Sequence, residues 1–231
     1  MEHKQFVQGE CLYHNSLSKE QDVENWKLEG QAKISFDDER LTLENELDPE
    51  THGDNAHWVF WCPNDFPDKI MIQWDFYPIQ EPGLCMMFFA AKGINGEDLF
   101  SPSLPKRTGK YPEYHSGSIN ALHLSYFRHK WPDERAFRTC NLRKSHGFHL
   151  VAQGADPLPP VEDAQSPYHL KLVKYEGIVQ FSINDLTVLE WEDDGKQFGP
   201  IHESGKIGIR QMAPMKASYS NLAVYEAKLE K

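Results

Sequence analysis

The amino-acid sequence predicts an all-β protein built as a sandwich of two antiparallel sheets. Apolar residues recur in short runs with alternating polarity, as in Ala32, Ile34 and Phe36, and no stretch keeps the periodicity of a long helix. Turn-forming pairs such as Glu176-Gly177 and Asn184-Asp185 separate these runs. About a dozen strands with almost no helix require two packed sheets or a closed barrel.

The first half of the chain supplies four predicted strand regions. Residues 26–45 are typical of a hairpin, because Leu41 and Leu43 resume the alternation after the turn at 37–40. The run at 84–91 is apolar at nearly every position, which is typical of a strand covered on both faces. Two further strands are predicted at 57–62 and 69–77.

Residues 92–117 lose the alternation and are rich in Gly, Pro and Ser. A loop of this length in a compact domain is usually functional or disordered. Its aromatic residues Phe100, Tyr111 and Tyr114 predict that it packs on another part of the protein. We expect it to fold over the concave sheet, beside the strands predicted at 118–129 and 137–142.

The last third has the pattern of a meander. Strands are predicted at 147–151, 168–175, 178–183, 186–191, 206–211 and 219–225, with a second loop at 155–167. The last strand is expected beside the segment that starts at Trp26, which brings the chain ends together on one sheet. No repeat or linker divides the chain, so residues 1–231 are predicted to form one domain, with 1–25 as an irregular N-terminal arm.

Composition and charge exclude several classes of partner. The formal net charge of −11 lacks the basic face that nucleic acid requires, and it disfavours an anionic membrane surface. No apolar run has the length that spans a bilayer, and the N-terminus lacks the apolar core of a signal peptide. The cysteines form no CxxC pair and are expected to be reduced, in a cytoplasmic protein. The sequence does not specify the oligomeric state.

Two groups of motifs resemble known proteins. The segment Gly205-Lys206-Ile207-Gly208-Ile209-Arg210, with the hairpin before it, is similar to the C-terminal half of concanavalin A-like lectin/glucanase jelly rolls. The segments GLCMMFFAAKGINGEDLF, YHSGSINALHLSYFRH and ERAFRTCNLRKSHGFHLVAQGADPLP resemble the YesU-like family of bacterial proteins, over about residues 26–225. This resemblance implies a galectin-like jelly roll, a carbohydrate ligand and, from the gene neighbours of some members, a role in the degradation of pectin-type polysaccharide. It implies no reaction.

A positively charged stretch inside this acidic protein is the main candidate site. Residues 128–149 contain Arg128, Lys130, Arg135, Arg138, Arg143 and Lys144, with His129, His146 and His149, against only Asp133 and Glu134. Arginine offers two parallel N–H donors to a carboxylate, so the stretch predicts binding of a carboxylate or sulfate on a sugar. The alternative is a pair of exposed strands with cross-strand ion pairs.

Alternation along the strands sorts the candidate residues without showing which face is concave. Asn120, Tyr126 and Arg128 share one face of their strand, and His123 and Ser125 share the other. Trp61 is the best candidate for stacking on a sugar ring, although core packing is the commoner role for a strand tryptophan. The predicted catalytic residues are Tyr126, His123, Arg128, Arg138, Asn141, Arg143, His146 and His149, and the predicted substrate-binding residues are Asn120, Ser125, Lys144, His57, Trp61, Arg107, Tyr111, Tyr114 and His115.

The residue types favour elimination over hydrolysis if the protein is an enzyme. Retaining hydrolysis needs two carboxyl groups facing one bond, and the nearest string, Glu46-Leu47-Asp48-Pro49-Glu50, is typical of a turn. Elimination on a uronate needs arginine to neutralise the carboxylate and His or Tyr to move a proton. The sequence leaves open a lyase or dehydratase on a uronate-containing oligosaccharide and a non-catalytic, lectin-like module. No metal or other cofactor is expected, because no ligand set or phosphate loop is evident.

Overall fold

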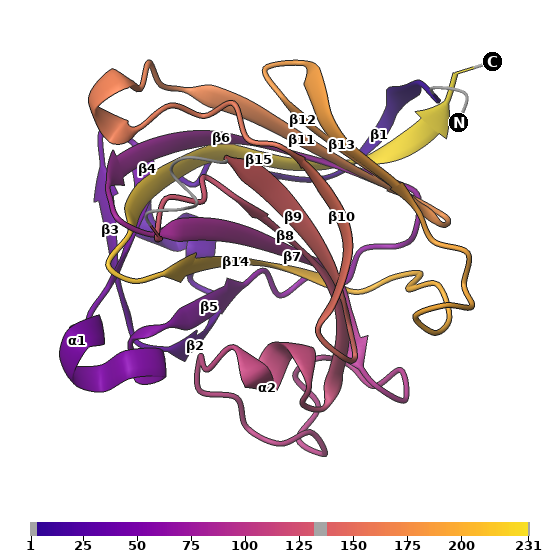
Figure 1. Ribbon diagram of the computed structural model, residues 1–231, viewed down its shortest axis with the longest axis horizontal. Coiled ribbons are helices and arrows are strands. Elements are labelled where there is room, and N and C mark those ends of the chain that lie inside the picture. Colours follow the sequence, from indigo (N-terminus) through magenta and orange to yellow (C-terminus); the bar gives the residue numbers. More distant parts are fainter. Residues whose placement is uncertain (1–3, 132–137, 231) are drawn as a thin grey trace.

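Two antiparallel sheets pack face to face in the computed structural model, which describes residues 4–131 and 138–230 (Figure 1). The eight-stranded sheet has the order β13-β12-β11-β6-β15-β4-β3, and β1 pairs with β15 outside this path. The seven-stranded sheet has the order β10-β9-β8-β7-β14-β5-β2. The predicted all-β, two-sheet jelly-roll sandwich is therefore confirmed.

The chain passes between the two sheets several times, with β7 to β10 consecutive in one sheet and β11 to β13 consecutive in the other. The eight-stranded sheet contains β1 (Phe6–Asn15), β3 (Ala32–Asp37), β4 (Arg40–Asn45), β6 (Ile70–Gln80), β11 (Tyr168–Tyr175), β12 (Ile178–Ile183), β13 (Leu186–Glu192) and β15 (Lys216–Leu229). The seven-stranded sheet contains β2 (Lys27–Gly30), β5 (Trp58–Trp61), β7 (Leu84–Gly93), β8 (Ile119–Tyr126), β9 (Thr139–Ser145), β10 (His149–Ala155) and β14 (Lys206–Met212). Among residues 4–131 and 138–230, helical structure is limited to α1 (Pro49–His52), α2 (Pro112–His115) and the 3-10 turns Glu20–Val23, Gly53–Ala56 and Val161–Asp163. Within the described residues, no helix has the length and apolar character needed to span a membrane.

The hairpins follow the turn chemistry of the sequence, whereas the N-terminus does not follow its prediction. Asn184 and Asp185 both have positive φ, at 47° and 63°, as the predicted type I′ turn between β12 and β13 requires.

The prediction of an irregular N-terminal arm is wrong, because β1 pairs antiparallel with β15. Most of its side chains are exposed or half-buried, so backbone pairing rather than an apolar stripe forms this strand. Phe6 opposite Leu229 confirms that the chain ends are adjacent.

The main core lies between the two sheets and includes Tyr126. This side chain is fully buried, and its ring lies 5.2 Å from the Phe76 ring and 5.8 Å from the Trp74 ring. The Tyr126 hydroxyl accepts a hydrogen bond from Trp74 Nε1 at 3.3 Å. Cys85 and Cys140 are buried in the same core, as expected for reduced thiols within strands.

A second apolar cluster lies on the outer face of the seven-stranded sheet, under the loop at residues 94–118. Leu99 and Tyr114 of this loop pack with Trp61 and Phe88 of the strands, which confirms that the loop folds over this sheet. An ion pair fastens the loop to β2, since Arg107 donates to both carboxylate oxygens of Glu29, at 3.0 and 2.7 Å. The same carboxylate accepts from Trp61 Nε1 at 2.9 Å.

A buried ion pair joins β9 to the segment after β13. Lys144 Nζ donates to Asp193 Oδ2 at 2.5 Å and to the Gly199 carbonyl at 2.9 Å. Lys144 has no solvent exposure and Asp193 is 7% exposed. Removing one member of such a pair leaves an uncompensated buried charge.

Replacing this lysine tests the structural role of the pair. Lys144→Met should lower the free energy of unfolding by about 3–5 kcal/mol, because the Asp193 carboxylate loses its counter-ion in a buried site. Urea unfolding followed by circular dichroism measures the change. The double variant Lys144→Met/Asp193→Asn should recover part of the loss, and equal instability of the single and double variants would contradict the explanation.

Candidate functional site

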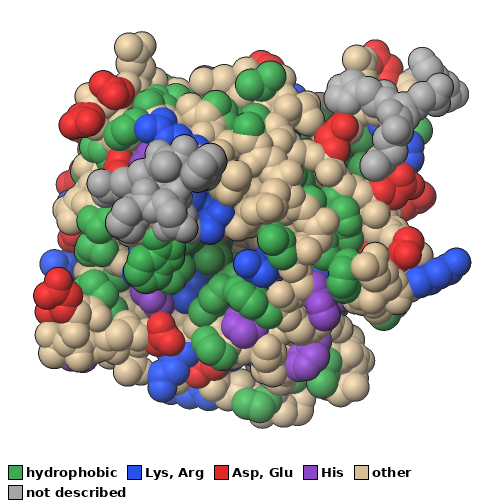
Figure 2. Space-filling view, in the orientation of Figure 1, with side chains coloured by type: hydrophobic (Ala, Val, Ile, Leu, Met, Phe, Trp, Pro, Cys, Tyr) green, Lys and Arg blue, Asp and Glu red, His purple; other side chains and the backbone are tan. Residues whose placement is uncertain are grey.

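Cross-strand pairing aligns polar side chains in two rows on the outer face of the seven-stranded sheet. Arg210, Met86, Ser125 and Asn141 form one row across β14, β7, β8 and β9. Gly208, Phe88, His123 and Arg143 form the next row. Because side chains two residues apart share a face, both rows point away from the core. Figure 2 shows hydrophobic, basic and histidine side chains around a hollow in the molecular surface.

Arg210 is the most buried cation in this region. Its side chain has no solvent exposure, its Nη1 donates to the Gly109 carbonyl at 2.7 Å, and its guanidinium lies 5.0 Å from the centre of the Tyr111 ring. Its Nε and Nη2 have no hydrogen-bond partner among the described residues. Burial lowers the pKa of Arg210. Because unpaired buried donors cost free energy, they favour an acceptor supplied from outside the chain.

Tyr111 of the loop and His123 of β8 form a hydrogen-bonded pair in front of this cation. The Tyr111 hydroxyl lies 2.9 Å from His123 Nδ1, and His123 Nε2 lies 3.1 Å from Ser145 Oγ. The His123 ring stacks on Phe88 with a centroid distance of 5.1 Å and an interplanar angle of 10°. Tyr111, His123 and Ser145 therefore form a continuous chain through which a proton can move.

The electrostatic surroundings fix the protonation states of this pair. Burial lowers the pKa of His123 well below its usual value, and Arg143, His115 and Arg210 reinforce the shift. Burial raises the pKa of Tyr111 to about 12, whereas Arg210, Arg143 and Arg128 oppose that shift. At neutral pH the histidine is neutral and the tyrosine keeps its proton. The positive charges of Arg210, Arg143 and Arg128 thus all act to lower the pKa of the Tyr111 hydroxyl.

Arg143 lies beside an exposed aromatic ring. Its guanidinium is 3.8 Å from the centre of the Phe148 ring, and its Nη1 donates to the Phe148 carbonyl at 3.2 Å. Phe148 is 47% exposed, and its ring also contacts the His115 ring, at a centroid distance of 4.3 Å. No carboxylate among the described residues pairs with Arg143. This corner therefore offers a cation and an apolar ring side by side.

Arg128 also lies on the outer face of the seven-stranded sheet, although strand alternation predicts that it shares a face with Tyr126. β8 ends at Tyr126, and Phe127 then adopts a left-handed backbone conformation with φ of 48°. Arg128 Nη1 consequently reaches Thr139 Oγ1 at 3.0 Å, and it donates to Asn141 at 2.6 Å when the amide oxygen faces it. The prediction that Arg128 shares a face with Tyr126 is wrong because regular alternation stops at Phe127. We call Arg128, Arg143, Arg210, Tyr111 and His123 the cationic face.

Several predicted site residues have structural positions instead. Tyr126 faces the core and Lys144 pairs with Asp193, so neither reaches the cationic face. Trp61 is fully buried beside Tyr114 and presents no ring to a sugar. Tyr114 is also buried, and its hydroxyl accepts from the Gly109 backbone N–H at 3.1 Å. Together with the Arg107–Glu29 ion pair, these contacts hold the loop on the sheet.

The remaining candidates lie around the cationic face or beyond it. His115 contacts the Tyr111 and Phe148 rings, and Ser125 and Asn141 lie in the row that ends at Arg210. Asn120 Oδ1 accepts from the exposed His146 backbone N–H at 3.1 Å, and His149 packs on Phe198 at 4.9 Å. Arg138 donates to the Leu158 carbonyl at 3.2 Å and lines a separate hollow with Glu81 and His129. Arg135, Asp133 and Glu134 lie outside the described residues.

Sequence reasoning missed Arg210 and Phe148. The available signal for Arg210 was a charged residue directly after the apolar residues Ile207 and Ile209 of a predicted strand. No comparable signal marked Phe148, which follows a glycine in a turn. No cluster of three or more potential metal ligands occurs among the residues that the structure describes.

His57 makes the stability of this region depend on pH. It is 3% exposed, its Nδ1 accepts from the Ala213 backbone N–H at 3.3 Å, and burial, Arg210 and Lys130 lower its pKa from 6.5 to about 3. Below pH 6.5 the unfolded chain therefore binds a proton that the folded chain does not bind. The free energy of unfolding should fall with decreasing pH, by up to about 1.4 kcal/mol per pH unit from this residue.

Urea unfolding as a function of pH tests this dependence. Between pH 6.5 and about 4, His57→Gln should show a shallower loss of stability than the unmodified protein. His52→Gln is the matched control, because it makes the same substitution at an exposed histidine. Equal slopes for all three proteins would show that His57 takes up its proton as readily in the folded state.

Comparison with known proteins places this architecture in a family. The family model described as a domain of unknown function, DUF1961, matches residues 10–224. The protein YesU of Bacillus subtilis (strain 168) is 62% identical over 222 residues, which cover 96% of this chain and 98% of YesU. A crystal structure of a Bacillus subtilis protein with a galectin-like fold superposes with a TM-score of 0.94 at 61% identity, covering 98% of this chain and 100% of that one.

More distant structures share the fold alone. The κ-carrageenase of Pseudoalteromonas carrageenovora, solved with an oligotetrasaccharide of κ-carrageenan, superposes with a TM-score of 0.59 at 7% identity, covering 99% of this chain and 97% of that one. A carbohydrate-binding module and carbohydrate recognition domains superpose with similar TM-scores. The resemblance to the YesU-like family is thus confirmed by the match at high identity, and the chain belongs to the DUF1961 family, with a galectin-like, two-sheet fold.

Proposed function

We propose that the protein binds an acidic, uronate-containing oligosaccharide on the cationic face. The observation that carries this proposal is the buried Arg210, whose Nε and Nη2 have no partner among the described residues and which lies behind Tyr111. Arg143 lies opposite His123 in the register between β8 and β9, and no carboxylate among the described residues pairs with it. A ligand carboxylate would neutralise these charges, and its two oxygens match the paired N–H groups of a guanidinium.

The surroundings of the arginines suit a sugar ring. Phe148 offers an exposed aromatic face next to Arg143, and the apolar face of a sugar can stack on it. Asn141 and Ser125 supply directional hydrogen-bonding groups in the adjacent row. The fold is also that of proteins whose names describe carbohydrate binding, which supports the ligand class without specifying a sugar.

The overall charge of the protein sharpens this selectivity. The chain carries a formal net charge of −11, so most of its surface repels an anion. Positive potential on the cationic face would therefore direct an acidic chain to this region alone. Binding should weaken as salt is added, because screening acts on the partly exposed arginines.

Replacing Arg143 tests the binding site. Arg143→Met keeps an apolar stem over Phe148 but removes the charge-assisted hydrogen bonds, so affinity for trigalacturonate should fall roughly tenfold to a hundredfold. Arg40→Met is the matched control, because Arg40 lies over the Tyr77 ring at 4.4 Å in the other sheet. Isothermal titration calorimetry with trigalacturonate and with its neutral methyl ester measures both effects. Equal binding of the two ligands, or equal losses in the two variants, would contradict the proposal.

A second candidate function is β-elimination on the bound uronate, and the Tyr111–His123–Ser145 chain favours it. Tyr111 would pass its proton to neutral His123 in the same step in which its oxygen takes the proton from the carbon next to the uronate carboxylate, so that no free phenolate forms. The arginines would stabilise the resulting enolate. As the carbon–carbon double bond forms, the bond to the leaving oxygen breaks, and that oxygen takes the proton from Tyr111. His123 then returns its proton to the tyrosine.

Tyr111→Phe separates elimination from binding. The variant should bind trigalacturonate with nearly the affinity of the unmodified protein but form no unsaturated product, because it lacks the group that exchanges the proton. Ultraviolet absorbance of the conjugated enoate, together with mass spectrometry, detects the product. If the unmodified protein binds uronate oligosaccharides and returns them unchanged, the non-catalytic, lectin-like module is the correct description.

A further inference from the structure

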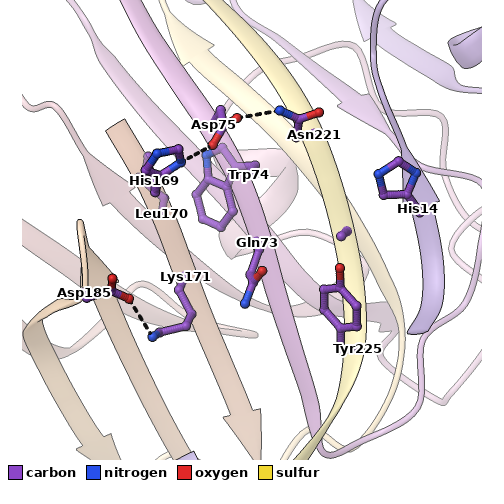
Figure 3. Close-up of a pocket in the computed structure, with 11 residues that line it drawn as sticks. His14, Gln73, Trp74, Asp75, His169, Leu170, Lys171, Asp185, Asn221 and Tyr225 are labelled. Carbon is purple, nitrogen blue, oxygen red and sulfur yellow. Dashed lines mark hydrogen bonds and ion pairs between the residues drawn. The ribbon is translucent and has the colours of Figure 1, made fainter. Parts of the chain in front are cut away.

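A second hollow lies on the opposite side of the sandwich, on the outer face of the eight-stranded sheet (Figure 3). It has a volume of about 320 Å³ and is bordered by β1, β6, β11 and β15. Ala223 of β15 lies between Gln73 of β6 and His14 of β1 in the cross-strand register. Because the alanine side chain is small, the floor is low at this point and the neighbouring side chains form walls around it.

One end of the hollow is a fixed, largely buried carboxylate. Asp75 is 9% exposed, and its Oδ2 accepts from Asn221 Nδ2 at 2.6 Å. Its Oδ1 lies 2.5 Å from His169 Nδ1. At the other end, Lys171 pairs with Asp185 at 3.2 Å. Asp75 is therefore held in place by two partners, whereas Lys171 has its counter-ion at the surface, where the Asp185 side chain is 94% exposed.

The middle of the hollow presents polar groups that have little to bind within the protein. The His14 ring and the Tyr225 hydroxyl make no hydrogen bond to the described residues, and the Gln73 amide has only a contact with Met71 Sδ at 3.2 Å. Figure 3 shows Gln73, Tyr225 and His14 on adjacent strands around the low floor. A hydroxyl-rich ligand would satisfy these donors and acceptors together.

We propose that this hollow is a second binding site, for a neutral saccharide unit. Gln73, His14 and Tyr225 offer both donors and acceptors, which is the pattern that sugar hydroxyls require. The Asp75 carboxylate would accept from a hydroxyl but would repel a uronate, and the Lys171 charge is neutralised by Asp185. The chemistry is opposite to that of the cationic face, and the proposal does not depend on that face.

Two sites on opposite sheets would make the chain bivalent. A polysaccharide that contains acidic and neutral units could then engage both faces, or two chains could be linked through one protein. Simultaneous binding raises the effective affinity without a new contact.

Filling the floor of the hollow tests the proposal. Methyl β-D-galactoside, methyl β-D-glucoside and methyl α-D-mannoside are the probes, and the ring C–H resonances of His14 and His169 in proton NMR spectra are the readout. At least one glycoside should shift both resonances in a saturable manner. Ala223→Leu, which places a larger side chain on the floor, should abolish the shifts, whereas the matched control Ala223→Ser should retain them.

Thermal unfolding shows whether the larger side chain is tolerated. If Ala223→Leu lowers the melting temperature strongly, Gln73→Ala and Tyr225→Phe replace it, and each should weaken the glycoside affinity several-fold by removing a polar group of the wall. The proposal is overturned if no neutral glycoside gives a saturable shift, if these variants bind as well as the unmodified protein, or if trigalacturonate shifts the same two resonances more strongly. These results are independent of the Arg143→Met titration, so each site can fail separately.

Discussion

The contact between Arg210 and the backbone at Gly109 is the interaction on which the cationic face depends. The Gly109 carbonyl accepts from the buried guanidinium at 2.7 Å, and Gly109 has a φ of 99°. A side chain at this position would place its Cβ 2.0 Å from the His57 carbonyl, so only glycine lets the loop lie directly on β5. This close approach buries the cation and sets Tyr111 in front of it. The fold thereby holds a charge away from water, beneath the loop.

The cationic face arises where two parts of the chain meet. The strands supply Arg143, Arg210 and His123 through cross-strand register, and the loop supplies Tyr111. The Arg107–Glu29 ion pair and the packing around Trp61 keep the loop in place, which explains why residues that resemble ligand-binding groups in the sequence serve as anchors. Burial then makes His123 neutral, while the guanidinium groups around it remain the source of positive potential.

The two outer faces of the sandwich differ because the core uses only one side of each strand. Side chains alternate, so every strand that fills the core also presents a second row to the outside. On the seven-stranded sheet that row is covered in part by a loop and is rich in arginine. On the eight-stranded sheet it is open, with Asp75 at one end of a hollow above Ala223. The two outer faces therefore differ in the charge of the side chains that they present.

By itself, the sequence determined the strands, the hairpin turns, the covering loop and the concentration of arginine and histidine after residue 128, because these depend on neighbours along the chain. Tertiary structure decided which face of each strand lies outside, because alternation gives two equivalent solutions until the sheets pack. Hence Tyr126 and Lys144 turned inward, while the left-handed Phe127 brought Arg128 to the outer face. Pairing with β15 ordered the largely exposed strand β1, and Arg210 joined the site through partners about a hundred residues away, at Gly109 and Tyr111. Such contacts leave no local pattern, since the residues that make them meet only when the chain is folded.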